Sequence, residues 1–460
     1  MIGLVGLVAL YGIALLMSRN RRAISPRLIA WGLGLQVIFA LVILKTPWGR
    51  AMFEALGAGV QALLVFADQG SLFVFGEAAD PGGDLGYVFA FRVLPIVIFI
   101  SSLFSVFYYL GVMQRIVLIM ARAMHRLMGV SGAESLAAAA NVFMGQTEAP
   151  IIVSPYIPAM TTSELMALMT SGMATVSGAV LASYIGLGVR PEYLLSASVM
   201  AAPASLVMAK LLIPETGESK TAGAVTIDVE PTDVNIIDAA ARGAGQGIML
   251  ALNIGGMLVA FVALIYLIDG VLAAVGGVFA SATRLAVALG LFAAMLGAYL
   301  LGWRPGPRGR NLTLGAGAVV AVVAVAVFLV RGPAPIALGL RPILATLFAP
   351  VAFVMGVPWA ESGAVGELFG IKLMLNEFVA YVELSALLRE GALSPKSELI
   401  ASYALCGFAN FASIGIQIGG IGSLAPTRRS DLASLGLRAV LGGTLATFTV
   451  ATLAGLLTSF

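Results

Sequence analysis

The stretch Gly145-Gln146-Thr147-Glu148-Ala149-Pro150 places an amide, a hydroxyl and a carboxylate side by side between two apolar runs. These runs, residues 135–144 and 149–158, are each too short to cross a hydrocarbon core, which takes about 20 helical residues. Two half-length helices joined by a polar tip predict a re-entrant hairpin over residues 131–160. An ionisable side chain deep in a membrane is costly, so Glu148 indicates a functional site; the alternative is that it only ties two helices together.

The composition supports a membrane setting for this hairpin. Of 460 residues, 60% are hydrophobic and 11% are charged, and the mean hydropathy is +1.01. So few charges cannot cover the surface of a water-soluble domain, and no alternation typical of an outer-membrane barrel is apparent. The sequence therefore predicts an all-α polytopic membrane protein. Its net charge of +3 gives no reason to expect a nucleic-acid partner, and its single cysteine, Cys406, excludes an internal disulfide.

Arginines set the expected orientation of the chain, because basic loops mark the cytoplasmic side. Four of them follow the first apolar run, residues 1–17, at once. They are Arg19, Arg21, Arg22 and Arg27. We therefore expect a multi-pass protein of the inner cell membrane with a retained first span and with both termini outside. Residues 1–110 are expected to form N-terminal spans of a scaffold, with an amphipathic interfacial helix over 49–66.

A second polar tip repeats the form of the first. Asn376-Glu377-Phe378 lies between two short apolar arms and predicts a hairpin over 364–388. Each hairpin precedes a span with small or polar residues at its centre, 165–187 and 398–424, which predicts two broken transmembrane helices. By the arginine positions the first hairpin enters from inside and the second from outside, as in inverted-topology repeats. The predicted repeats cover 111–213 and 331–460, the second ending in a span over 431–460.

The segments between the repeats are assigned by polarity. Residues 214–242 are polar and predict a cytoplasmic loop, and residues 243–283 predict a scaffold span. Residues 284–330 have no counterpart in the first half, and two apolar spans joined by a basic turn predict an inserted transmembrane hairpin. Because these spans carry no polar group that would bind a substrate, we expect them on the lipid-facing side of the scaffold.

The motifs resemble those of one family. The stretch 145–150 and the run Gly370-Ile371-Lys372-Leu373-Met374-Leu375-Asn376-Glu377-Phe378-Val379-Ala380-Tyr381 resemble two signatures of the concentrative nucleoside transporters. The second fits that family's G-x-K-x3-N-E-F-V-A-Y pattern throughout, and Gly407-Phe408-Ala409-Asn410-Phe411 resembles a third conserved stretch. The resemblance implies a homotrimer in membrane lipid, in which a mobile transport domain carries nucleosides into the cell with sodium by an alternating-access, elevator-like mechanism.

By position, the resemblance implies eight substrate-binding residues. Those that would hydrogen-bond the nucleobase are Gln146, Thr147 and Glu148, with Val180 packed against it. Those that would hold the ribose are Glu377, Asn410 and Ser413, with Phe408 lining the pocket. A vicinal diol offers two donors that a carboxylate accepts in charge-assisted bonds, and the amide, hydroxyl and carboxylate of the first tip match the mixed donors and acceptors of a base edge.

The resemblance also implies a sodium site between the first hairpin tip and the break in the span that follows. The implied ligands are Asn141, Met144, Thr175 and Val176. Asparagine and threonine offer side-chain oxygens, the apolar pair offers only backbone carbonyls, and hard cations prefer such oxygen ligands. Because the chain keeps Asn141, Thr175 and the intact first motif, we favour sodium coupling. Proton coupling through Glu148 or Glu377 is the alternative.

Two other classes of protein fit the sequence poorly. An intramembrane enzyme needs a nucleophile with a base, or a metal held by several histidines or carboxylates, whereas this chain has one histidine and one cysteine. A channel needs a continuous polar pore without alternating access, and the paired hairpins argue against one. We therefore expect a transporter and not an enzyme. The sequence alone does not choose between pyrimidine and purine nucleosides.

Overall fold

The structure is a computed structural model that describes residues 2–80, 82–83, 88–221, 233–278 and 339–458. Within these ranges the chain forms helices and turns and no strand, so the predicted all-α fold is confirmed. Seven of the described helices are long and apolar enough to cross a membrane. The expected inserted hairpin, 284–330, lies outside the described residues.

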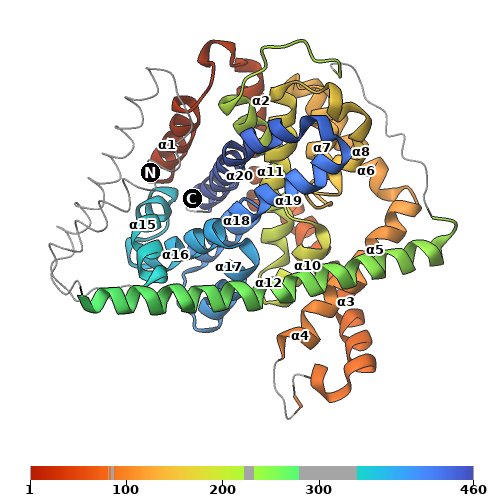
Figure 1. Ribbon diagram of the computed structural model, residues 1–460, viewed down its shortest axis with the longest axis vertical. Coiled ribbons are helices and arrows are strands. Elements are labelled where there is room, and N and C mark those ends of the chain that lie inside the picture. The colour runs from red at the N-terminus through yellow and green to blue at the C-terminus, as the bar shows by residue number, and fades with distance from the viewer. Residues whose placement is uncertain (1, 81, 84–87, 222–232, 279–338, 459–460) are drawn as a thin grey trace.

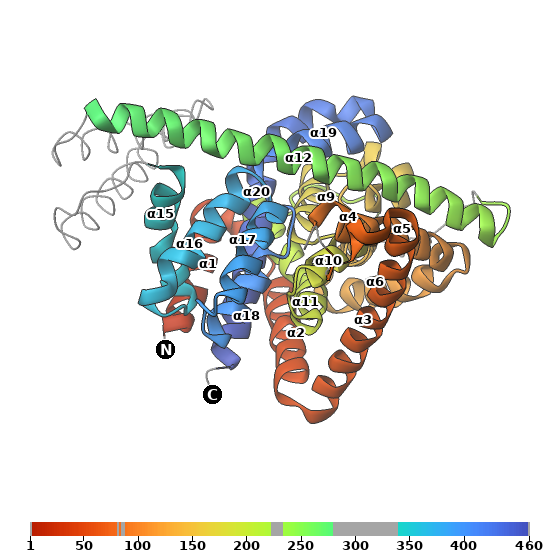
Figure 2. The same cartoon turned by 90° about the horizontal axis from the view of Figure 1, so that it is seen from below.

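The N-terminal part consists of three helices, α1 (Ile2–Leu16), α2 (Pro26–Lys45) and α3 (Pro47–Phe75). Thr46 ends α2 and caps α3 with its hydroxyl, and the two helices diverge from it like the arms of a V (Figure 2). The expected interfacial helix over 49–66 is therefore part of a longer helix, which by length and composition is a candidate span.

A second group of helices packs around one member, α5. It contains α4 (Phe89–Arg92), α5 (Leu94–Tyr109), α6 (Val112–Met128) and α12 (Ile236–Val278). Helix α12 is one continuous helix that runs past α5 and α17 (Figure 1), and it begins inside the expected loop 214–242. It approaches α5 closely because Gly247 has no side chain: a Cβ there would lie 2.6 Å from the Cα of Ile98.

The first repeat contains the first hairpin and the first broken span. The hairpin has α7 (Gly132–Ala140), a turn through residues 141–148, α8 (Ala149–Ile152) and a 3-10 helix, Ser154–Ala159. The span has α9 (Thr162–Ala174) and α10 (Gly178–Gly186), and α11 (Pro191–Leu212) follows it. Both α7 and α9 begin with a capping box, in which a Ser or Thr and a Glu satisfy the free N–H groups of the first turn.

The second repeat has the same order of elements. Helix α15 (Leu340–Met355) and α16 (Trp359–Met374) meet at a bend of 116°. Helix α17 (Glu377–Arg389) completes the hairpin, α18 (Pro395–Leu405) and α19 (Phe411–Leu424) form the second broken span, and α20 (Arg429–Leu457) is the last helix. Both breaks fall where small and polar residues predict them, so the two broken helices are confirmed. The remaining 3-10 helices are Arg21–Ala23, Gly76–Ala79 and Pro426–Arg428.

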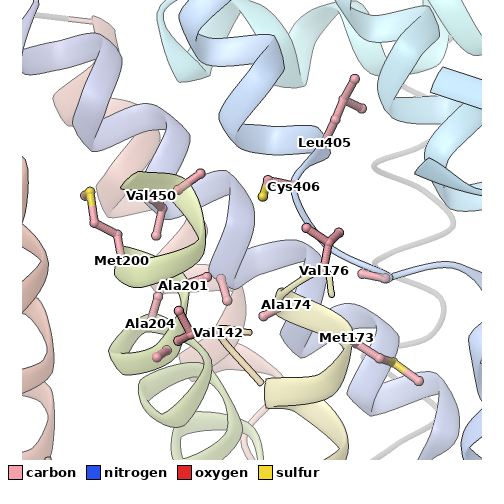
Figure 3. Close-up of a cluster of buried hydrophobic side chains, with 14 of the residues drawn as sticks. Val142, Met173, Ala174, Val176, Met200, Ala201, Ala204, Leu405, Cys406 and Val450 are labelled. Atoms are coloured by element: carbon pink, nitrogen blue, oxygen red, sulfur yellow. The ribbon is translucent and has the colours of Figure 1, made fainter. Parts of the chain in front are cut away.

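The centre of the core lies where the two broken spans meet. Figure 3 shows Ala174 and Val176 of the first break close to Cys406 of the second, with Met200 and Ala201 of α11 beside them. All five residues are buried. This packing places the ends of four half-helices in one region, and the polar groups of those ends form the site described next.

Candidate functional site

Backbone contacts join the two breaks to the first hairpin tip. The N–H of Phe408 in the second break donates to the carbonyl of Thr175 in the first, at 3.2 Å, and the N–H of Gly178 donates to the carbonyl of Phe143 at 2.9 Å. Gly407 makes the first contact possible, because a Cβ there would lie 2.9 Å from the carbonyl oxygen of Ala174. The sequence-distant tips and breaks are therefore one structural unit.

The second hairpin tip holds Glu377 firmly. The side chain of Asn376 caps α17 by accepting from the N–H of Val379, which fixes Glu377 in the first turn. Glu377 is only 5% exposed. Its Oε1 accepts from the Tyr184 hydroxyl at 3.2 Å, and its Oε2 accepts from the Asn410 amide at 3.0 Å. Because a carboxylate has about four acceptor sites, this buried group can still accept from further donors.

The start of α19 connects this carboxylate to the first hairpin. Asn410 is the N-cap of α19, and its side-chain oxygen accepts from the N–H of Ser413 at 2.8 Å. The hydroxyl of Ser413 accepts from Nε2 of Gln146 at 3.0 Å. A continuous chain of hydrogen bonds therefore runs from Glu377 through Asn410 and Ser413 to Gln146, and it brings four predicted site residues together.

The three polar residues of the first tip differ in burial. Gln146 is buried, Thr147 is half-buried and Glu148 is exposed. Oε2 of Glu148 accepts from the N–H of Gly145 at 2.9 Å, which closes the turn. Thr147 packs on α19, where a Cβ at Gly420 would lie 2.8 Å from its methyl group. Only Gln146 enters the buried network, while the other two lie on the same tip beside it.

Apolar side chains border the network. Val180 is buried in the first turn of α10, and Phe408 is half-buried in the second break. Tyr184 lies one turn beyond Val180 and stacks on Tyr381, with ring centroids 3.9 Å apart. Polar groups between apolar walls are the usual composition of a small-molecule site.

The four predicted ion ligands lie at the first break and the tip that contacts it. Nδ2 of Asn141 donates to Ser171, whereas its buried Oδ1 has no hydrogen-bond partner in the described part of the chain. The Thr175 hydroxyl donates to the carbonyl of Ser171, so its own oxygen remains free to accept. Met144 and Val176 add backbone carbonyls at the tip and the break. A buried acceptor without a donor suits a hard cation.

Three further residues belong to this region although they were not predicted. They are Tyr184, Lys372 and Gln417. Tyr184 bonds Glu377, Gln417 bonds Gln146, and the buried Lys372 ammonium donates to the carbonyl of Ala404 at 2.7 Å and to Thr447 at 3.1 Å. Tyr184 and Gln417 each lie one helical turn beyond a predicted residue, Val180 and Ser413, so a search for polar groups on the same helix face would have found them.

Family models match most of the chain. The model of the "Na+ dependent nucleoside transporter C-terminus" matches residues 193–305 and 312–455, and that of the N-terminus matches residues 5–78. A "Nucleoside recognition" model matches residues 90–190, which include the first hairpin. The gap in the C-terminal match, 306–311, falls in the basic turn of the expected insert.

Relatives cover nearly the whole chain. A transporter of Haemophilus influenzae is 42% identical over 458 residues, which cover 98% of this chain and 96% of the relative. The nucleoside permease NupC of Helicobacter pylori is 38% identical over 459 residues, with 98% and 96% covered. The sodium/nucleoside cotransporter 1 of Mus musculus is 37% identical over 454 residues, which cover 96% of this chain but 61% of the longer mouse protein.

Solved structures agree with these sequence matches. CNTnw in an inward-facing, substrate-bound state superposes with a TM-score of 0.83 at 39% identity, covering 100% of this chain and 98% of that one. A variant of CNTnw in an outward-facing state superposes with a TM-score of 0.83 at 38% identity, covering 100% of this chain and 97% of that one. The chain is therefore a multi-pass membrane protein that belongs to the sodium-dependent, or concentrative, nucleoside transporter family, a family of transporters and not of enzymes.

Proposed function

We propose that this chain carries nucleosides into the cell together with sodium, and that it binds both between its two hairpin tips. The observation that supports this most is the hydrogen-bonded chain from Glu377 through Asn410 and Ser413 to Gln146. It joins residues from both repeats around polar atoms with unused hydrogen-bonding capacity. A substrate that contacts both tips links the two repeats, as a site at the meeting point of inverted repeats requires.

The ribose end of the site is assigned to the second tip. Each oxygen of Glu377 accepts one hydrogen bond from a side chain, and the remaining acceptor capacity of the carboxylate is available to the hydroxyls of a ribose. Bonds from hydroxyls to a carboxylate are charge-assisted and stronger than neutral ones. Asn410 and Ser413 complete this end, because they already contact Glu377 and Gln146.

The base end is assigned to the first tip. Gln146 offers an amide, Thr147 a hydroxyl and Glu148 an exposed carboxylate, which together match the mixed donors and acceptors of a base edge. Val180 and Phe408 supply the apolar surfaces that a flat ring needs on its faces. The exposed position of Glu148 leaves its carboxylate accessible to a ligand that enters from the aqueous side.

Sodium is assigned to Asn141, Met144, Thr175 and Val176. The buried Oδ1 of Asn141 supports this assignment, because a buried acceptor without a donor among the described residues gains from a cation. The same turn carries Gln146, so an ion that orders the turn also orders the base-binding group. Coupling between ion and nucleoside follows from this shared element.

The mechanism proposed is alternating access by movement of a transport domain against a scaffold. Both hairpins would be re-entrant, with their tips near the middle of the inner membrane and both chain termini outside. Three such chains would form the homotrimer that the family resemblance implies. The inward-facing and outward-facing structures of CNTnw support a cycle of this kind.

Uptake into proteoliposomes tests the proposal. Radiolabelled uridine, cytidine, adenosine and guanosine are offered with sodium outside, and in parallel with choline in its place at the same pH. Uptake that needs sodium supports the proposal. Uptake that persists in choline and follows an imposed pH gradient favours the proton-coupled alternative, and no uptake of any nucleoside contradicts the proposed function.

A further inference from the structure

Gln417 is a buried polar residue of α19, one turn beyond Ser413, and its side chain is 0% exposed. Its Nε2 lies 3.0 Å from the carbonyl oxygen of Met169 in α9 and 3.1 Å from Oε1 of Gln146. Gly172 leaves room for it, because a Cβ there would lie 2.9 Å from that nitrogen. Gln417 therefore sits between α9 and the first hairpin tip, behind the predicted base-binding amide.

The backbone of α9 fixes which way the Gln417 amide faces. A carbonyl oxygen only accepts hydrogen bonds, so the atom of Gln417 beside Met169 has to be its NH2 group. The same nitrogen contacts the Gln146 amide, and that amide must in turn present its oxygen. The carbonyl of Met169 therefore sets the orientation of the Gln146 amide, through the Gln417 amide that lies between them.

This orientation decides which hydrogen-bond donors and acceptors of Gln146 and Ser413 remain free for a ligand. Nε2 of Gln146 uses one hydrogen on Ser413 and keeps one, and Oε1 uses one lone pair on Gln417 and keeps one. Because Ser413 accepts from Gln146, its own proton remains free to donate. If the Gln146 amide turned over, its free donor and free acceptor would exchange places.

We propose that Gln417 is a positioning residue that fixes the facing of the Gln146 amide, and that it thereby sets the preference of the site between uracil and cytosine. This inference rests on the proposed nucleoside site. Uracil and cytosine have the same shape, but uracil presents an acceptor and an N–H donor where cytosine presents an NH2 donor and an acceptor. An amide held in one orientation matches one of these edges and opposes the other.

The test compares uridine with cytidine in Gln417→Glu. A protonated carboxyl whose O–H group replaces that NH2 group donates its single hydrogen to Met169 and presents only a lone pair of the same oxygen to Gln146, so the Gln146 amide turns over and Ser413 donates to it. We expect the ratio of uridine to cytidine dissociation constants, measured by calorimetry in sodium, to shift by about tenfold or more towards the base that the wild type disfavours. Gln417→Met removes both orienting bonds and should bring the ratio towards one.

Two controls separate positioning from packing. Gln36→Met changes a buried glutamine of α2 that bonds its own helix at Gly32, and it should leave the ratio unchanged. In a Gln146→Ala background, Gln417→Glu should no longer shift the ratio, because the amide through which it acts is gone; a purely structural role would give additive effects.

The outcomes are distinct. A wild type that binds both nucleosides equally, a ratio unchanged in Gln417→Glu and Gln417→Met, or a shift that survives in the Gln146→Ala background overturns the role of Gln417 and leaves the proposed function intact. A wild type that binds neither nucleoside overturns the proposed function itself.

Discussion

The two hairpin tips carry equivalent glutamates in different surroundings. Glu377 is buried and held on both oxygens by Tyr184 and Asn410. Glu148 is exposed, and the hydrogen bond that its side chain accepts in the described structure comes from the N–H of Gly145 in its own turn. The carboxylate of the second tip is thus arranged in advance, whereas that of the first tip is accessible and can still adjust to a ligand. This difference suits a ribose common to all nucleosides and a base that varies among them.

The two repeats also differ in the source of positive charge at their helix breaks. In the second repeat, Lys372 places its ammonium on the carbonyl of Ala404 at the C-terminal end of α18, where a cation is favoured. In the first repeat, Asn141 presents a buried oxygen that has no donor among the described residues. We interpret the second repeat as carrying its own fixed cation and the first as completed by a mobile one.

The largest expected effect comes from the prearranged tip. Glu377→Gln removes the charge from the proposed diol contact, and affinity for uridine should fall by about ten- to a hundredfold, because charge-assisted bonds contribute about 1.5–3 kcal/mol. Calorimetry with uridine and 2′-deoxyuridine measures this. As a control, Glu390→Gln changes an exposed residue just after the end of the same helix and should bind uridine like the wild type. Wild-type affinity for uridine in Glu377→Gln would contradict the diol contact.

Removing the fixed cation should cost stability. Lys372→Met leaves the buried carbonyl of Ala404 without its donor, which should lower the free energy of unfolding by about 1–3 kcal/mol. Thermal unfolding in detergent measures the change. Thr447→Val removes only the other partner of the ammonium and should cost less. An unchanged unfolding temperature in Lys372→Met would show that the ammonium does not hold this break together.

Removing a side-chain ligand of the proposed sodium ion should weaken the response of uptake to sodium. In Asn141→Ala and Thr175→Ala, the sodium concentration for half-maximal uptake should rise by about tenfold, because each loses one oxygen ligand, while the order of preferred bases stays the same. Ser183→Ala is the matched control, since among the described residues that buried hydroxyl bonds only its own helix, at Ala179. Wild-type sodium dependence in both variants would remove the ion from this break.

The smallest effect is expected at the support of Glu377. Tyr184→Phe keeps the stacked ring but removes the hydroxyl that donates to Glu377, and uridine affinity should fall by about three- to tenfold. Tyr381→Phe loses a hydroxyl that bonds the carbonyl of Ser402 instead, and uridine affinity should change less. Equal losses in the two variants would indicate a general packing effect.

Local patterns in the sequence predicted the parts of the site that depend on local chemistry. Glu148 and Glu377 stand out because a carboxylate in an apolar run is costly. The breaks stand out because Gly, Ser and Asn interrupt apolar spans, as at Gly407 and Asn410. These signals were sufficient to predict an all-α membrane protein with two broken helices.

The contacts that sequence reasoning missed join distant segments. Tyr184 reaches Glu377 across 193 positions, and Gln417 reaches Gln146 across 271, so no periodicity within one helix reveals either pair. Helix α3 continues beyond the expected end at residue 66 as far as Phe75, and Asp68 in this extension contacts Arg92 at 3.7 Å. Contacts of this kind depend on the tertiary fold and are not visible in the local sequence.

The most direct measurement of sodium-coupled nucleoside binding is calorimetry of the purified protein with uridine, in sodium chloride and in choline chloride at the same pH. Because both ligands are proposed to order the first tip, sodium should tighten uridine binding by about 5- to 150-fold, and uridine should tighten sodium binding by the same factor. Uridine binding of equal affinity in the two salts, in a protein that transports normally, would contradict a shared site at the first hairpin.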